Sequence, residues 1–370
     1  MSLAPINKSL FLDQVSAWPM CPQVTSPGQF VRALIVIFAL MALCAAMLLQ
    51  GTAHAAPASE QERFQSFVHS LWPQARARGV SQPTFAAAFK NVVPDPNVLA
   101  LTKRQPEFRK TIAQYLASAV SQKRIDAGQA KAREWKTVLE HVDARYGVDP
   151  YVVLGVWGLE TNFGTYMGDL STIRSLATLA FAHYRGDYFR RELLDALDIL
   201  EARHVAPADM QGSWAGAMGH TQFMPSSFKI YAVDYDGDGH KDIWKSIPDA
   251  LASTANYLKR HGWIANETWG YEVTLPAGFV SASHAANPQR PFAHWAALGL
   301  TRTDGEPLPR SGTAAFLQPA AAGPAFLVTP NFKVIKSYNN STSYALGVVL
   351  LGDRIAGEGP LKAAWPVAER

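Results

Sequence analysis

A short apolar helix between two strong boundary signals constrains this chain more than any other stretch. Asp149-Pro150 is typical of a helix N-cap followed by proline at the first helical position. Asn162 and Gly164 are residue types that end helices. The pattern therefore predicts a helix over residues 151–161. With 370 residues and 48% hydrophobic content, the chain can bury a large core around it.

Glu160 stands near the end of this expected helix. The residues three, four and seven positions earlier are Trp157, Val156 and Val153, so the carboxylate shares a face with apolar side chains. Burial and the helix dipole at a C-terminus both disfavour the anion. The sequence thus predicts a carboxylic acid with a raised pKa, suited to acid–base chemistry. The alternative is a Glu at a frayed helix end, paired with Lys or Arg.

The N-terminal stretch has the pattern of an export signal. Residues 33–49 carry no charge, Arg32 precedes them, and Ala53-His54-Ala55 follows as a small-x-small cleavage pattern. We therefore expect a secretory signal peptide over residues 1–55. An uncleaved membrane anchor is the alternative, and lipidation at Cys44 and a true start at Met20 also stay open.

Without residues 1–55, the chain has no cysteine and carries 32 basic against 29 acidic residues, a net charge of +3. This excess is compatible with an anionic polymer as ligand, and no basic run suits nucleic acid. We expect an exported protein that folds without disulfides and does not bind nucleic acid.

The periodicity predicts a mainly α fold with a small β part, an α+β class. Helices are expected over residues 60–77, 81–89, 110–146 with a turn at 126–128, 169–182, 189–203, 249–260 and 345–355, with a break at 104–108 and no strand before Gln211. Strands are expected over residues 271–275, 325–328 and 331–336, in and beside a stretch rich in Pro, Gly and Ala.

A Gly-rich stretch over residues 212–227 offers the groups that bind sugars. Its glycines allow a ligand close to the backbone, Gln222 can donate and accept hydrogen bonds, and Trp214 and Phe223 provide flat apolar faces. The alternative is a Gly-rich packing loop with core aromatics.

An acidic loop follows, with the spacing of an EF-hand calcium loop. Asp234, Asp236 and Asp238 occupy positions one, three and five, His240 would give its backbone carbonyl, and position twelve is Lys245 instead of Glu. Asp249 is the nearest carboxylate that could close the site. We expect calcium here; a solvated acidic turn is the alternative.

Four motifs occur together in a specific order: residues 158–164 (GLETNFG), residues 216–226 (GAMGHTQFMPS), the acidic loop, and Tyr338-Asn339 before a last helix. Over residues 60–354 the chain resembles the membrane-bound lytic murein transglycosylase B family, lysozyme-like enzymes that cut peptidoglycan.

The resemblance implies a lysozyme-like core with an extra helical region, a small β-containing sub-domain and a structural Ca²⁺. The implied regions after the leader are an N-terminal helical region (56–145), the catalytic core with the calcium loop (146–265), the β sub-domain (266–333) and a C-terminal segment returning to the core (334–370). Glu160 matches the family's single catalytic acid/base. The implied glycan-groove residues are Ser213, Gln222, Phe223, Tyr257, Tyr338, Asn339, Tyr344 and Arg185.

Two departures from the family are visible. Arg185 stands alone where the family often has paired arginines, and His220-Thr221 stands where a relative has Tyr-Gly. Both concern contacts to substrate and leave Glu160 in place.

The implied reaction breaks the MurNAc–GlcNAc β-1,4 bond without water and leaves a 1,6-anhydroMurNAc end. A hydrolytic muramidase, with Asp187 or Glu192 as a second carboxylate, and a non-catalytic peptidoglycan-binding protein are the alternatives. The expected setting is a periplasmic monomer on glycan strands. Membrane attachment and association with cell-wall synthesis or division proteins stay open.

Overall fold

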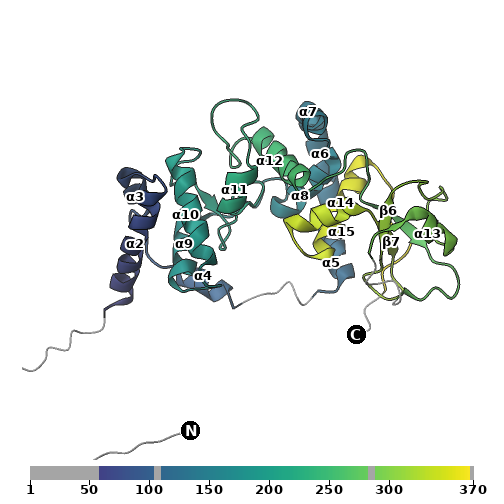
Figure 1. Cartoon of the computed structure of the whole chain (residues 1–370), viewed down its shortest axis with the longest axis horizontal. Helices are drawn as coiled ribbons and strands as arrows, with labels where there is room; N and C mark the ends of the chain where they lie inside the picture. The colour runs from purple at the N-terminus through teal and green to yellow at the C-terminus, as the bar shows by residue number, and fades with distance from the viewer. Residues whose placement is uncertain (1–57, 104–109, 282–287, 367–370) are drawn as a thin grey trace, which may run out of the picture. The chain divides into compact units, whose positions relative to one another are not determined.

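The structure, a computed structural model, describes residues 58–103, 110–281 and 288–366 (Figure 1). The predicted signal peptide and the expected break at 104–108 lie outside these residues. In the described part, none of the helices combines the length and the apolar character needed to cross a membrane.

The described chain is mainly helical, as expected. Its helices are α2 (Glu60–Ala77), α3 (Gln82–Ala88), α4 (Pro96–Leu101), α5 (Ile112–Ala119), α6 (Gln122–Glu134), α7 (Lys136–Tyr146), α8 (Pro150–Thr161), α9 (Thr172–Phe181), α10 (Tyr188–Glu201), α11 (Pro225–Tyr231), α12 (Ile247–Arg260), α13 (Phe292–Ala297), α14 (Pro330–Tyr338) and α15 (Thr342–Ala356). Its strands are β1 (Leu170–Ser171), β2 (Gln211–Gly212), β3 (Gly270–Thr274), β4 (Arg290–Pro291), β5 (Thr301–Arg302), β6 (Thr313–Leu317) and β7 (Ala325–Val328).

Helices α8 and α15 pack against each other at the centre of the core (Figure 1). Glycines on both helices allow a close approach: a Cβ added at Gly155 would lie 2.3 Å from the carbonyl oxygen of Val348. On α15, a Cβ added at Gly352 would lie 2.7 Å from the carbonyl oxygen of Tyr151. Because the added Cβ atoms would meet backbone atoms in both cases, glycine at these two positions sets how closely the two helices can pack.

The small β part is one antiparallel sheet in the order β4-β6-β7-β3-β5. In the central pair, Gly270 lies opposite Val328 and Val273 lies opposite Ala325. Helix α13 packs on this sheet (Figure 1), and its Trp295 is fully buried in a second apolar cluster. The predicted β-containing sub-domain is therefore present, joined to the helical body through α14.

Three local predictions are wrong. Residues 331–336 form part of helix α14, because Pro330 takes the first helical position after Thr329, so the predicted boundary between 333 and 334 cuts a helix. Strand β1 occurs before Gln211 and pairs with β2. The expected turn at 126–128 lies inside α6, where buried Gly128 lets the helix approach Ile355.

Candidate active site

Glu160 lies in the last turn of α8, beside the start of α15. Asp149 caps α8 by accepting the backbone N–H of Tyr151 at 2.8 Å, and Asn162 ends the helix in the left-handed conformation. Ser341 caps α15 by accepting the backbone N–H of Tyr344 at 3.3 Å. The two caps therefore place Glu160 and Tyr344 on neighbouring helix ends, where the Tyr344 hydroxyl donates to Glu160 Oε1 at 2.6 Å.

The environment of Glu160 favours the protonated acid. Burial raises the pKa of Glu160 to about 7, although the hydrogen bond from Tyr344 acts in the opposite direction by stabilising the carboxylate. Among the residues that the structure describes, no second carboxylate contributes to this raised pKa. Glu160 as a whole is half-buried. A lone acid with this pKa can protonate a leaving group near neutral pH and then act as a base.

An aromatic wall of Phe223, Tyr257 and Tyr338 stands beside Glu160. The Tyr257 and Tyr338 rings lie 4.7 Å apart, and Phe223 lies 5.6 and 5.8 Å from them. The Tyr338 hydroxyl donates to the carbonyl of Thr221 at 2.6 Å, and the Tyr257 hydroxyl donates to that of Ser337 at 2.6 Å. Burial raises the pKa of Tyr338, and the nearby charge of Glu160 raises it further. Because Phe223 is only 2% exposed, its ring supports the wall from behind.

The polar groove residues lie on the Gly-rich loop and at the end of α14. Gln222, with φ of 51°, donates through Nε2 to the carbonyl of Met167 and to that of Gly219, both at 2.9 Å, which leaves its Oε1 as the acceptor. Ser213 accepts the backbone N–H of Ala217 at 3.1 Å and keeps its own hydroxyl proton to donate. Asn339 is exposed and accepts the backbone N–H of Ser341 at 3.2 Å.

Arg185 and the candidate second carboxylates lie on the turn and helix after α9. The exposed Arg185 lies over the ring of Tyr184, with its guanidinium carbon 5.4 Å from the ring centre. Asp187 is exposed, and Glu192 is buried and accepts the backbone N–H and the hydroxyl of Ser226 at 2.9 and 2.8 Å. In the described part of the chain, no hydrogen bond or ion pair joins any of the three to Glu160.

The acidic loop brings three carboxylates together. Asp234, Asp236 and Asp249 offer oxygen atoms that all lie within 4.8 Å of one another. Asp249 is 1% exposed, and repulsion from the other two adds to burial in raising its pKa. Asp238 lies outside this cluster and accepts the backbone N–H of exposed His240 at 2.7 Å. The hard oxygen donors and their mutual repulsion fit a calcium ion.

The motif analysis missed one interaction beneath the catalytic helix. The indole N–H of Trp157 donates to His220 Nδ1 at 3.0 Å, and His220 is 8% exposed. Burial lowers the pKa of His220 to about 4, so the imidazole is neutral at neutral pH and can accept this bond. The available signal was the unusual His220-Thr221 pair itself.

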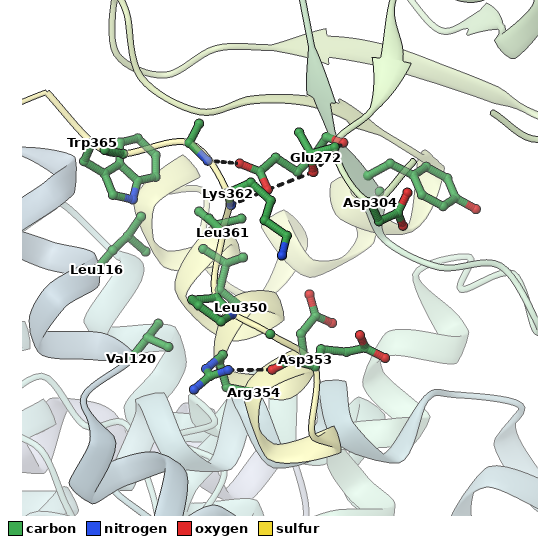
Figure 2. A pocket seen from close by; sticks show the side chains of 18 of the residues that line it. Leu116, Val120, Glu272, Asp304, Leu350, Asp353, Arg354, Leu361, Lys362 and Trp365 are labelled. Carbon is green, nitrogen blue, oxygen red and sulfur yellow. Dashed lines mark hydrogen bonds between the residues drawn. The ribbon is translucent and has the colours of Figure 1, made fainter. Parts of the chain in front are cut away.

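A separate cavity of about 800 Å³ lies toward the other end of α15. It is lined by Leu350, Asp353 and the C-terminal segment around Leu361, and by none of the predicted site residues. The backbone amides of Lys362 and Ala363 donate to the Glu272 carboxylate, each at 2.8 Å. These bonds attach the C-terminal segment to β3 of the small sheet. Figure 2 shows Lys362 beside Glu272.

The helical fold, in which an acid of raised pKa lies beside a polar loop and an aromatic wall, is typical of lysozyme-like enzymes that cleave glycosidic bonds. Residues 63–353 match the family model described as Transglycosylase SLT domain. The chain belongs to this family.

Relatives named as lytic transglycosylases agree with this assignment. Membrane-bound lytic murein transglycosylase B of Escherichia coli (strain K12) is 35% identical over 256 residues, which cover 65% of this chain and 66% of the relative. SltB3 from Pseudomonas aeruginosa, solved in complex with NAG-anhNAM-pentapeptide, is 46% identical with a TM-score of 0.80 and covers 83% of both chains. The Escherichia coli lytic transglycosylase Slt35, solved in complex with calcium, is 31% identical with a TM-score of 0.67, covering 80% of this chain and 93% of its own.

Proposed function

We propose that this protein is a lytic peptidoglycan transglycosylase that uses Glu160 first as acid and then as base. The observation that carries the proposal is the half-buried Glu160, bonded to Tyr344, with its pKa raised to about 7 and no second carboxylate of the described residues acting on it. Family membership and the relatives' names support the same chemistry.

The reaction needs no protein nucleophile. Glu160 donates its proton to the glycosidic oxygen between MurNAc and GlcNAc while the N-acetyl oxygen of MurNAc attacks its own anomeric carbon, and the C–O bond breaks. The resulting carboxylate then takes the proton of the MurNAc 6-hydroxyl. That oxygen closes on the anomeric carbon, releases the N-acetyl group and leaves a 1,6-anhydro end.

The polar groove residues would hold the glycan around this step. Gln222 Oε1, the Ser213 hydroxyl and the Asn339 amide are hydrogen-bonding groups on half-buried or exposed side chains. Ser213 and Asn339 are suited to stabilise the positive charge that develops at the anomeric carbon. The aromatic wall of Phe223, Tyr257 and Tyr338 would line the groove, with Phe223 behind the two tyrosines. Tyr344 would lie beside it at Glu160, and Arg185 is on the turn before α10.

The bound cation would be structural. Asp234, Asp236 and Asp249 would hold Ca²⁺, with the carbonyl of His240 as a further ligand and Asp238 in support. The ion would offset the mutual repulsion of the three clustered carboxylates and fasten the loop to α12 through Asp249. A relative solved in complex with calcium supports the binding of this ion.

The proposed setting is the periplasm, after removal of residues 1–55, with peptidoglycan glycan strands as substrate. A monomer suffices for the reaction, because all of the proposed site residues come from one chain.

Digestion of purified sacculi by the isolated protein tests the function. We expect soluble muropeptides whose masses are one water lighter than the corresponding reducing sugars. Products with reducing muramic ends would identify a hydrolytic muramidase, and no release at all would indicate a binding protein.

A further inference from the structure

Among the residues that the structure describes, His220 provides the hydrogen bonds between the last turn of α8 and the Gly-rich loop. Its Nδ1 accepts the indole N–H of Trp157 at 3.0 Å. Its backbone carbonyl lies 3.4 Å from the Thr161 hydroxyl, whose one proton is shared with the carbonyl of Trp157 at 3.3 Å. Its backbone N–H donates to the carbonyl of Ile243 at 2.9 Å. Trp157 and Thr161 flank Glu160 in the sequence, so His220 bonds the helix on both sides of the acid.

The surroundings leave the imidazole little freedom. A Cβ added at Gly164 would lie 2.3 Å from His220 Cε1, which shows that the ring packs directly on the backbone that follows the helix. The Trp157 ring also meets Phe163 edge-on at 5.5 Å. The end of α8, the Gly-rich loop and the His220 ring therefore pack together behind Glu160.

We propose that His220 is a positioning residue for the reaction: its neutral imidazole holds Trp157 and thereby fixes the last turn of α8, and with it the Glu160 carboxyl group, against the Gly-rich loop. This inference rests on the proposed function, because it concerns the acid that the reaction uses. His220 itself touches no reacting atom.

The titratable and charged groups around His220 and Glu160 are consistent with this role. Asp242 and Lys131 act on the pKa of His220 in opposite directions, and burial dominates, so the ring stays neutral. A protonated ring would carry N–H on both nitrogen atoms and could not accept the indole proton. Around Glu160, the titratable groups are the hydroxyls of Tyr344 from α15 and Tyr338 from α14.

Three single variants and one double variant separate positioning from folding. His220→Phe keeps a ring but removes the acceptor, Trp157→Phe keeps a ring but removes the donor, and His220→Asn keeps an acceptor near the place of Nδ1. The double variant Trp157→Phe with His220→Phe leaves no unpaired polar group. For each, kcat, KM, melting temperature and the pH dependence of kcat are measured on soluble glycan strands.

We expect about a tenfold fall in kcat at pH 7 for His220→Phe and for Trp157→Phe, with KM within about twofold of wild type. The alkaline limit of kcat should move to lower pH, because a loosened helix end exposes Glu160 to solvent and lowers its pKa. His220→Asn should stay near wild type, and the double variant should be no worse than either single phenylalanine variant.

Unchanged kcat and an unchanged alkaline limit in folded His220→Phe would overturn the inference, and so would a lower melting temperature with both kinetic readouts intact. If His220→Phe does not fold, the same criteria apply to Trp157→Phe. Activity of the wild type is established first, so a wild type that makes no anhydro product defeats the proposed function and not this inference.

Discussion

The hydroxyl of Tyr344 donates to Glu160 Oε1 at 2.6 Å across 184 positions of sequence. This bond joins the C-terminal end of α8 to the N-terminal end of α15, the two helices whose glycines allow their backbones to meet. Burial raises the pKa of Glu160 and the Tyr344 bond lowers it, so the pair sets the pH at which the acid is available.

Removing this hydroxyl should move the pH profile in a defined direction. In Tyr344→Phe, the carboxylate loses a donor, so the pKa of Glu160 should rise above its wild-type value of about 7. Because the reaction starts from the protonated acid, the alkaline limit of kcat/KM should shift to higher pH. The pH–rate profiles of the two proteins check this, and a shift to lower pH would contradict the assigned role of the bond.

Replacing the acid itself should separate catalysis from folding. Glu160→Gln is isosteric but cannot donate and then accept a proton, so turnover should fall by a factor of about 10²–10⁴ or more. Glycan binding and the far-ultraviolet circular dichroism spectrum should stay unchanged. More than about a hundredth of the wild-type rate would remove Glu160 from its role.

The same variant should change the pH dependence of stability. The pKa of Glu160 is raised from 4.5 to about 7, so the folded state holds the proton more tightly than the unfolded state. Wild type therefore loses stability as pH rises from 4.5 through 7, whereas Glu160→Gln does not. At pH 4 we expect the two proteins to have equal free energies of unfolding. At pH 8 that of Glu160→Gln should be larger by about 1–2 kcal/mol, a value discounted for the partial exposure of Glu160. Denaturant titrations at the two pH values measure it.

Calcium should stabilise the fold without entering the reaction. Binding to the folded state alone would add about 2.7 kcal/mol at a hundredfold excess over Kd. Melting curves with calcium and with chelator should differ for wild type and coincide for Asp249→Asn, which breaks the carboxylate cluster. Asp209→Asn is the matched control, because this half-exposed carboxylate pairs with Lys245 nearby and lies outside the cluster. If the wild-type melting curves with calcium and with chelator coincide, the acidic loop does not bind a calcium ion that stabilises the fold.

The close approach of α8 and α15 predicts a large effect from a single methyl group. Gly155→Ala places a Cβ 2.3 Å from the carbonyl oxygen of Val348, so the helix backbones must separate. We expect a loss of about 1–3 kcal/mol in the free energy of unfolding. Gly359→Ala is the control, since a Cβ there meets nothing within 4 Å. Equal unfolding midpoints for the two variants would show that the helices can move apart freely.

Elements with a clear signal in the nearby sequence, such as a helix cap or an apolar run, were predicted correctly. The helix over 60–77 and the strand over 325–328 are found at the predicted bounds, and Asp149-Pro150 located the start of α8. The strand expected over 331–336 is wrong, because Pro330 is a helix-start signal and begins α14 there. Helix α6 continues through Gly128 because tertiary packing on Ile355 needs a residue without a side chain there.

The sequence indicated candidate residues for the site, but it did not indicate the contacts that the structure shows among them. Periodicity placed Glu160 on an apolar face, but the Tyr344 bond depends on the packing of helices far apart in sequence. The flat ring of Phe223 suggested sugar stacking, whereas the fold buries it behind Tyr257 and Tyr338. His220 was visible only as an unusual residue, because its partner Trp157 lies 63 positions away.

Digestion of sacculi in ¹⁸O-labelled water tests the central claim, that one acid and the substrate's own 6-hydroxyl break the bond. A transglycosylase should leave 1,6-anhydromuramic ends without label, each one water lighter than a reducing end. A hydrolase would place one labelled oxygen at every new reducing end. Labelled reducing ends as the main product would contradict the account, while Glu160 could still be the acid.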